Sequence, residues 1–160
     1  MQVVVRQPDE TAGDVSVGSP VPEVPPEENE DPIDNILASD TPTAQKAEQL
    51  LSLMPSLPAS EQVEAAQHLV NLLNDEQFLA AGYYLTNQDA AAEVQSVFVA
   101  ELLNRPEKLK LPLCLAIAST TGHRHAREAK DLLGLHVAED HGTNWPAWAQ
   151  AIQSLLEQDR

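Results

Sequence analysis

Cysteine and basic residues are scarce in this sequence of 160 residues, and both shortages restrict its function. Cys114 is the only cysteine, so no disulfide can form within the chain. Nine basic residues stand against 25 acidic ones, which gives a net charge of −16. Because a field of that sign repels phosphate groups, we expect neither nucleic acid nor an anionic membrane surface as a partner.

Long apolar runs are also missing. No segment is apolar over enough residues to span a bilayer, and residues 1–10 lack the apolar stretch of a secretory signal. We therefore expect no membrane insertion by this chain. The lack of a signal favours the cytoplasm, whereas a periplasmic location would require that a signal or an anchor had been removed.

The sequence motifs of common catalytic sites do not occur: there is no GxSxG, P-loop or GxGxxG pattern. Cys114 lies between Leu113 and Leu115, and this apolar setting predicts a buried thiol rather than a reactive one. The one cluster of metal-ligating residue types is poorly spaced, since His123 and His125 would point apart on a helix. Its members are His123, His125, His136, Glu139, Asp140 and His141. We expect no metal site, no cofactor and no catalytic residue.

Residues 1–42 differ in composition from the rest. They hold ten acidic residues and one basic residue, together with seven of the twelve prolines. Such a segment cannot bury enough apolar surface to offset its loss of conformational entropy. The sequence therefore predicts an acidic, disordered arm over 1–42 and a folded domain over 43–160. Ile33, Ile36 and Leu37 have helical spacing, so docking of this part on the domain or on a partner is the alternative.

Apolar residues at helical spacing, together with helix-start residues, divide 43–160 into a series of helices. Ser60 is a predicted N-cap, Asn74 begins another helix, and Pro112 is expected to kink or restart the helix that contains it. The last helix is the clearest, because Trp148, Ala151, Ile152, Leu155 and Leu156 form one apolar stripe. The expected helices cover about 43–54, 61–73, 75–85, 91–103, 106–119, 123–136 and 146–157.

Three of these helices can be aligned at intervals of 31 and 32 residues. Val63, Val94 and Ala126 then correspond, and apolar residues follow three, six and nine positions later in each helix. Each aligned helix is preceded by another, and stacked helix pairs bury a continuous core that one pair cannot build alone. We therefore expect an all-α fold, a short right-handed solenoid of about three antiparallel helix pairs plus a C-terminal capping helix.

The segment Ala126–Gly134, with the sequence AREAKDLLG, resembles the second helix of HEAT-type repeats in the armadillo superfamily. Leu111-Pro112 resembles the proline of the family's first helix, whereas residues 63–69 lack the family's arginine and residues 94–97 fit least. The resemblance covers about residues 43–140. It implies a HEAT-like helical array that serves as a binding scaffold, and it carries no catalytic residue onto this chain.

One part of the sequence is locally basic. Between residues 105 and 130, six bases stand against two acids. This pattern predicts a patch for an acidic peptide or for the chain's own arm, with an ordinary solvated face as the alternative. Trp145, just before Pro146, is a candidate partner anchor, or else a hydrophobic staple at the helix start. The predicted basic residues are Arg105, Lys108, Lys110, Arg124, Arg127 and Lys130.

These features together predict a non-enzymatic scaffold or adaptor that binds a protein or peptide. The alternatives are a HEAT-like enzyme or enzyme subunit, lyase-like in kind, and the soluble part of a membrane-attached or periplasmic assembly factor. A deep pocket with convergent polar groups would favour the enzyme, and a shallow groove or open patch would favour the binding module.

Overall fold

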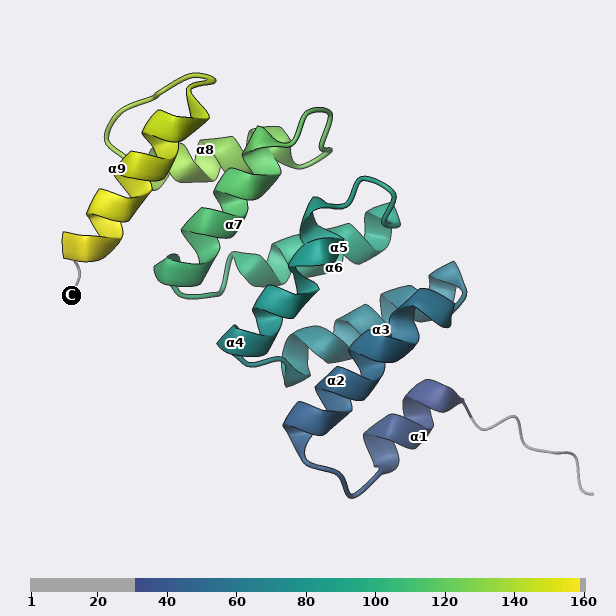
Figure 1. Ribbon diagram of the computed structural model, residues 1–160. Helices are drawn as coiled ribbons and strands as arrows, with labels where there is room; N and C mark the ends of the chain where they lie inside the picture. The colour runs from purple at the N-terminus through teal and green to yellow at the C-terminus, as the bar shows by residue number, and fades with distance from the viewer. Residues whose placement is uncertain (1–30, 159–160) are drawn as a thin grey trace, which may run out of the picture. The chain divides into compact units, whose positions relative to one another are not determined.

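In the computed structural model, residues 31–158 are described, and over these residues the chain is helical without any strand (Figure 1). The predicted all-α class is confirmed. The predicted disorder of the arm concerns mainly residues 1–30, which lie outside the described residues together with 159–160. The helices are α1 (Pro32–Ala38), α2 (Thr43–Leu53), α3 (Ala59–Leu72), α4 (Asp75–Phe78), α5 (Gly82–Thr86), α6 (Ala92–Leu102), α7 (Glu107–Ser119), α8 (Ala126–His136) and α9 (Trp145–Gln158), with 3-10 turns η1 (Met54–Ser56) and η2 (Leu79–Ala81).

Helix α1 extends the packed part of the chain beyond the boundary expected from composition. The Asp31 carboxylate accepts a hydrogen bond from the N–H of Ile33 at 2.8 Å, and Pro32 occupies the first turn. Ile33 is fully buried, and the Lys46 ammonium on α2 donates to the carbonyl of Leu37 at 2.6 Å. Residues 31–42 therefore belong to the packed part, in line with the docking alternative, because a capped helix with a buried isoleucine outweighs their acidic composition.

Prolines and one asparagine explain where several helices begin. Proline occupies the N-cap of α2, α3 and α7, where its fixed φ and missing N–H cost no helix hydrogen bond. Helix α3 thus begins directly after Pro58, and the prediction that Ser60 caps it is wrong. Asn74 caps α4 as predicted, since its side-chain oxygen accepts from the N–H of Gln77 at 2.8 Å.

One predicted helix is divided in the structure, and another continues where a break was allowed. The helix expected over 75–85 is divided into α4, the turn η2 and α5. Helix α7 instead continues through Pro112 to Ser119, so the restart that the sequence allows at this proline does not occur. A proline inside a helix removes one hydrogen bond, and the buried side chains of Leu109, Leu111 and Cys114 on the same helix offset that loss.

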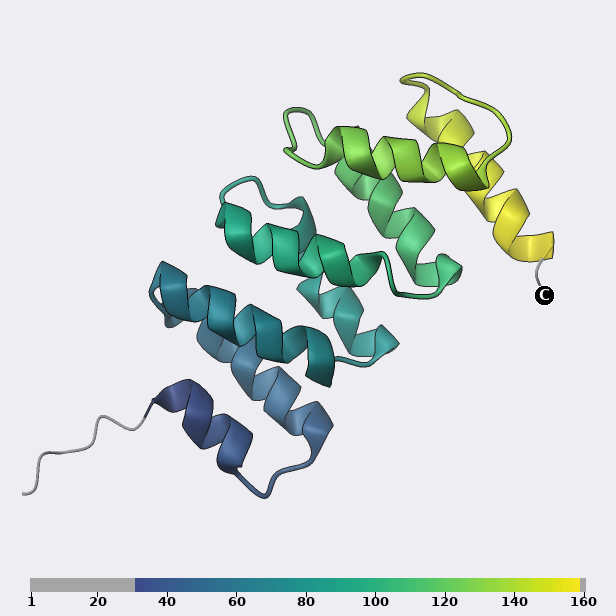
Figure 2. The same cartoon turned by 180° about the vertical axis from the view of Figure 1, so that it is seen from behind.

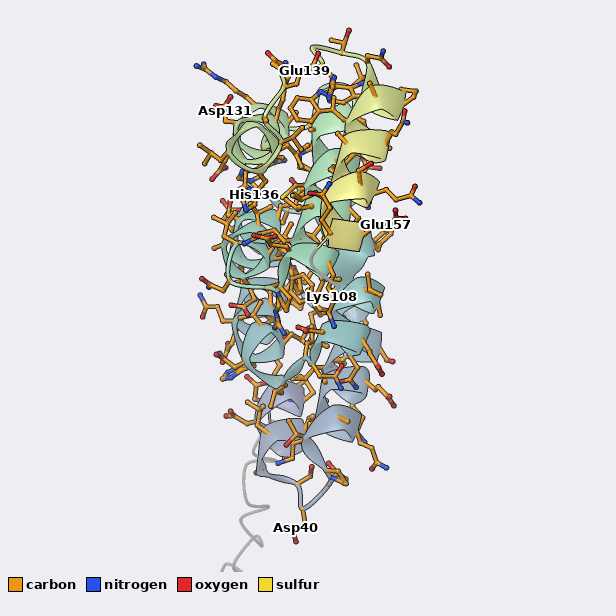
Figure 3. All side chains as sticks on the ribbon, turned by 90° about the vertical axis from the view of Figure 1, so that its left-hand side faces the viewer. Asp40, Lys108, Asp131, His136, Glu139 and Glu157 are labelled. Atoms are coloured by element: carbon orange, nitrogen blue, oxygen red, sulfur yellow. The ribbon has the colours of Figure 1, made fainter. Side chains whose placement is uncertain are left out.

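The helices pack mainly against helices that are close to them in sequence. Contacts join α1 to α2, α2 to α3, α3 to α6, α5 to α6 and α7, and α7 to both α8 and α9. Figures 1 and 2 show α3, α6 and α8 in one layer and α2, α4, α5, α7 and α9 in the other. In Figure 3 the two layers are seen edge-on. Buried apolar side chains from α1 to α9 fill the space between them.

The repeat alignment predicts the apolar positions of α6 and α8 only in part. Leu103 and Leu135 stand nine residues after Val94 and Ala126, yet they are 37% and 83% exposed. Nine residues advance an α-helix by about two and a half turns, so the last position points away from the first. The buried side chains recur at intervals of four instead: Val94, Phe98 and Leu102, and Ala129, Leu133 and Val137. Leu103 and Leu135 are therefore apolar positions of the alignment that the fold leaves exposed.

Candidate functional site

Arg105 belongs to the interior of the fold rather than to a binding surface. Its side chain is 12% exposed, and its guanidinium lies 3.2 Å from a carboxylate oxygen of Asp75 and 3.0 Å from one of Glu101. It also donates to the carbonyl of Val70 at 3.1 Å and covers the ring of Phe78 at 4.6 Å. Arg105 thus joins the end of α6 to α3 and α4, and these contacts describe a packing residue rather than a free basic group.

The three lysines of the predicted patch lie in separate settings. Lys110 donates from Nζ to the carbonyl of Leu103 at 3.2 Å, and Lys108 is exposed on α7 (Figure 3). Lys130 lies 3.4 Å from a carboxylate oxygen of Asp140. The N–H of Gly142, which donates to Asp140 at 2.8 Å, holds the pKa of that carboxyl below its ordinary value, and Lys130 adds to this effect. Lys130 therefore fixes the segment that follows α8.

Trp145 is the first residue of α9, and its side chain is partly buried against the core. Its N–H donates to the carbonyl of Thr143 at 3.0 Å. Trp145 therefore contributes to the packing at the start of α9, and its role as a partner anchor stays a prediction.

Arg124 and Arg127 remain as exposed basic residues, and they line a shallow hollow beside α8. This hollow has a volume of about 520 Å³ and is called the α8 hollow below. Exposed leucines share it: Leu135 and Leu103 are two of the four large apolar side chains that stand out as exposed within residues 31–158. Its lining consists of Leu103, Arg124, Arg127, Glu128, Asp131, Leu132 and Leu135.

The acidic residues of the α8 hollow are partly engaged within the protein. Glu128 lies 3.0 Å from Nδ1 of His125, and Asp131 lies 3.9 Å from Nε of Arg127. Arg127 remains 94% exposed despite this distant contact, and Arg124 has no ion pair within the described residues. The hollow therefore presents two available guanidinium groups beside an apolar surface.

The sequence reveals the arginines of this site but not its leucines. Local charge singles out Arg124 and Arg127 because basic residues are rare in the chain. The repeat alignment shows only that Leu103 and Leu135 are apolar. The 3.6-residue period over the full length of α8 places Leu135 off the buried face, but it does not show that Leu103 and Leu135 line the same hollow.

His123 and His136 have hydrogen-bond partners within the fold, whereas the buried Nε2 of His141 has none among the described residues. Of the predicted cluster, His136, Glu139 and His141 line one hollow of about 340 Å³. His123 is buried, its Nε2 lies 2.7 Å from the carbonyl of Leu85, and its Nδ1 accepts from the N–H of His125 at 3.1 Å. His136 contacts the carbonyl of Leu132 through Nδ1 and lies 3.4 Å from Glu107 through Nε2 (Figure 3). Within residues 31–158, no group of three metal-ligating side chains could hold an ion.

Two other hollows lack the residues that acid–base chemistry needs. One of about 350 Å³ lies between α7 and α9, is mainly apolar, and has Glu157 as its only carboxylate. Another of about 400 Å³ holds Tyr83 and Tyr84 and has Asp89 as its only carboxylate. Neither places a histidine, lysine or arginine beside that carboxylate, and such pairing is the usual basis of general acid–base catalysis.

Cys114 is predicted to resist thiol reagents in the folded protein. It is buried on α7, and burial raises the pKa of its thiol from 9.0 to about 11. The thiolate fraction at pH 8 therefore falls about 100-fold. We expect labelling by a disulfide reagent to be at least about 100-fold slower in the native protein than in urea, with an unstructured cysteine peptide as control. Equal rates in both states would show that the thiol is accessible.

None of the helices within residues 31–158 combines the length and apolar character that crossing a bilayer requires. No family model matches this chain, and no curated protein or solved structure matches it.

Proposed function

We propose that the protein is a non-enzymatic binding module whose α8 hollow takes an acidic, partly apolar segment of a protein partner. Its helices would form a short HEAT-like array, with the pairs α2–α3, α5–α6 and α7–α8 and with α1 and α9 at the ends. The contacts within these pairs support that arrangement. The observation that carries the function is the meeting of exposed leucines and exposed arginines in one hollow.

The ionisable groups with shifted pKa values support a non-catalytic function. Catalytic sites gather such groups in one cleft, because their chemistry requires perturbed acids and bases side by side. Here the pKa is raised in Tyr84 and Cys114 and lowered in His123 and Asp140, and these residues lie on four different elements. Burial is the main cause in the first three, and a local hydrogen bond is the main cause in Asp140.

The leucines would supply most of the binding free energy, and the arginines would supply selectivity. Full burial of a leucine side chain contributes about 1.5–3 kcal/mol, so Leu135 alone has room to contribute more than 1 kcal/mol. An exposed ion pair contributes about 0–1 kcal/mol. A partner with leucines and carboxylates would gain from both apolar burial and ion pairing, whereas a purely acidic partner would gain only from ion pairing and would bind weakly.

A displayed library of random peptides tests this function. We expect the selected peptides to combine acidic and apolar residues, and we expect Leu135→Ala to weaken their binding by about tenfold. Leu79→Ala is the matched control, because Leu79 is 58% exposed but lies outside the α8 hollow. Alanine favours helices, so neither change should unfold the protein. Failure to select any peptide whose binding depends on Leu135 would refute the proposed function.

A further inference from the structure

We propose that the segment bound in the α8 hollow is an amphipathic helix, with its carboxylates about two helical turns away from its apolar anchors. This inference rests on the proposed function of the hollow and adds the conformation and residue pattern of the partner. It follows from the arrangement of the lining residues along α8, from the direction of α6, and from the hydrogen bonding of both helices.

Five of the lining residues form one stripe on the surface of α8, and Arg124 lies in the turn just before this helix. The five stand at positions 127, 128, 131, 132 and 135, which are successive intervals of one, three, one and three residues. Such intervals keep side chains on one helix face, and the stripe is about 12 Å long at a rise of about 1.5 Å per residue. Arg127 begins the stripe next to Arg124, and Leu132 and Leu135 lie in its second half.

Helix α6 runs beside α8 in the same direction, and Leu103, the residue that follows α6, bounds the hollow on that side. The hydroxyl of Ser96, near the start of α6, lies 3.5 Å from Nε2 of His125, at the start of α8. Leu103, just after the end of α6, lines the hollow together with Leu132 and Leu135 near the end of α8. Figure 2 shows the two helices side by side. The hollow is therefore an open face of α8 bounded by Leu103, and such a face accepts the side-chain ridge of a second helix.

The backbone of α6 and α8 offers nothing to an extended strand. The N–H and C=O groups inside a helix are bonded to each other, and Ala129, Val137 and Gln95 show these bonds continuing at the helix ends. An extended peptide would leave its own N–H and C=O groups without backbone partners on this surface. A helical segment satisfies those groups internally and presents only side chains, so it fits the hollow without that loss.

Arg124 and Arg127 are the groups of the hollow that can pair with carboxylates on the partner, although Glu128 and Asp131 in the same lining bring its formal charge to zero. Arg124 has no ion pair within the described residues, and Arg127 has one at 3.9 Å. The net charge of −16 repels an acidic partner at long range, but salt screens charges beyond about 10 Å at 0.1 M. Contact with the two guanidinium groups is screened less, so carboxylates beside them are favoured.

Synthetic peptides test the helical form of the partner. The first probe, roughly 16 residues of Glu, Ala and Leu, carries glutamates in its first two turns and leucines on one face of its last two turns. The second has one central alanine replaced by proline, which breaks the helix and keeps the charge. The third has lysine in place of every glutamate. Binding of each is measured by fluorescence anisotropy in about 0.1 M salt.

We expect the helical probe to bind at least about tenfold more tightly than the proline probe, and to gain helical circular dichroism on binding. The double variant Arg124→Glu, Arg127→Glu should lose about tenfold in affinity for the helical probe and should bind the lysine probe instead. Lys108→Glu is the matched control, since it changes an exposed charge outside the hollow and should alter neither affinity. Rescue by the lysine probe excludes simple misfolding of the double variant.

The outcomes separate this inference from the proposed function. Equal binding of the helical and proline probes, with both sensitive to Leu135→Ala, would overturn the helical inference and leave the binding function intact. If neither probe binds but the displayed library yields peptides whose binding depends on Leu135, the helical inference is again overturned and the binding function is left intact. If the library also yields none, both proposals are overturned.

Discussion

Replacing Trp148 with alanine should lower the free energy of unfolding by about 3–5 kcal/mol. Trp148 is fully buried on α9, and α9 packs against α7. Its ring meets the ring of His141 edge-on, with centroids 5.3 Å apart, and its Nε1–H donates to the carbonyl of Gly142 at 3.3 Å. The substitution removes a large apolar surface and leaves a cavity, and it also deprives Gly142 of a hydrogen bond.

Two matched variants separate the contributions of Trp148. Trp148→Phe keeps an aromatic ring but loses the indole N–H, so about 1–2 kcal/mol should be lost. Trp145→Ala, three residues earlier on the same helix, removes a partly buried indole and should cost clearly less than Trp148→Ala. Urea unfolding followed by circular dichroism measures all three. A loss below about 1 kcal/mol for Trp148→Ala would show that α9 does not depend on this side chain.

Helix α9 is the element that the sequence predicts best, and the reason is local. Its apolar residues recur at three and four positions without interruption, so one face is defined by the segment itself. The structure buries Trp148 and Ile152 on that face and partly buries Ala151, Leu155 and Leu156. Where a helix has a single apolar face and a clear start, periodicity alone predicts both its position and its contacts.

Arg105 shows why bases that are close in sequence need not share one surface. Besides Glu101, its partners are Asp75 and the carbonyl of Val70, which are 30 and 35 residues away. Such pairing depends on how α6 packs beside α3 and α4, and the local sequence does not contain that information. Arg124, in the turn before α8, and Arg127, on α8, have no such long-range pairing within the described residues and remain exposed.

Helix α1 shows the opposite error, in which composition hides a local signal. The acidic residues and prolines of residues 1–42 predict disorder when they are averaged. The order of residues at its end predicts a helix, because an aspartate cap, a proline in the first turn and spaced isoleucines follow one another. The order of the residues at the end of this segment therefore predicts its structure better than the average charge of the whole segment does.

Replacing His123 with alanine should lower the free energy of unfolding by about 2–4 kcal/mol at pH 7.5. The side chain is buried between the segment before α8 and the end of α5. Its Nε2–H donates to the carbonyl of Leu85, while its Nδ1 accepts from the N–H of His125. This pair of bonds requires a neutral ring with its proton on Nε2. Alanine would leave a buried acceptor and a donor without partners.

The pH dependence of stability identifies the neutral ring. Burial is the main cause that lowers the pKa of His123 below 6.5, and the charges of His125 and Arg124 lower it further against the effect of the bond to Leu85. As the pH falls below 6.5, the unfolded chain binds a proton that the folded chain does not, so the stabilising contribution of His123 is lost toward its folded pKa.

The difference in stability between the wild type and His123→Ala should therefore be largest above pH 6.5 and should shrink by pH 5. Urea unfolding at several pH values measures this difference, and Thr121→Ala, an exposed change in the same segment, should show no such trend. Two-bond ¹H–¹⁵N spectra of the imidazole should show the proton on Nε2. If the stability difference stays constant from pH 7.5 to 5, His123 takes up its proton as readily in the folded chain as in the unfolded one, and its two hydrogen bonds do not hold it neutral.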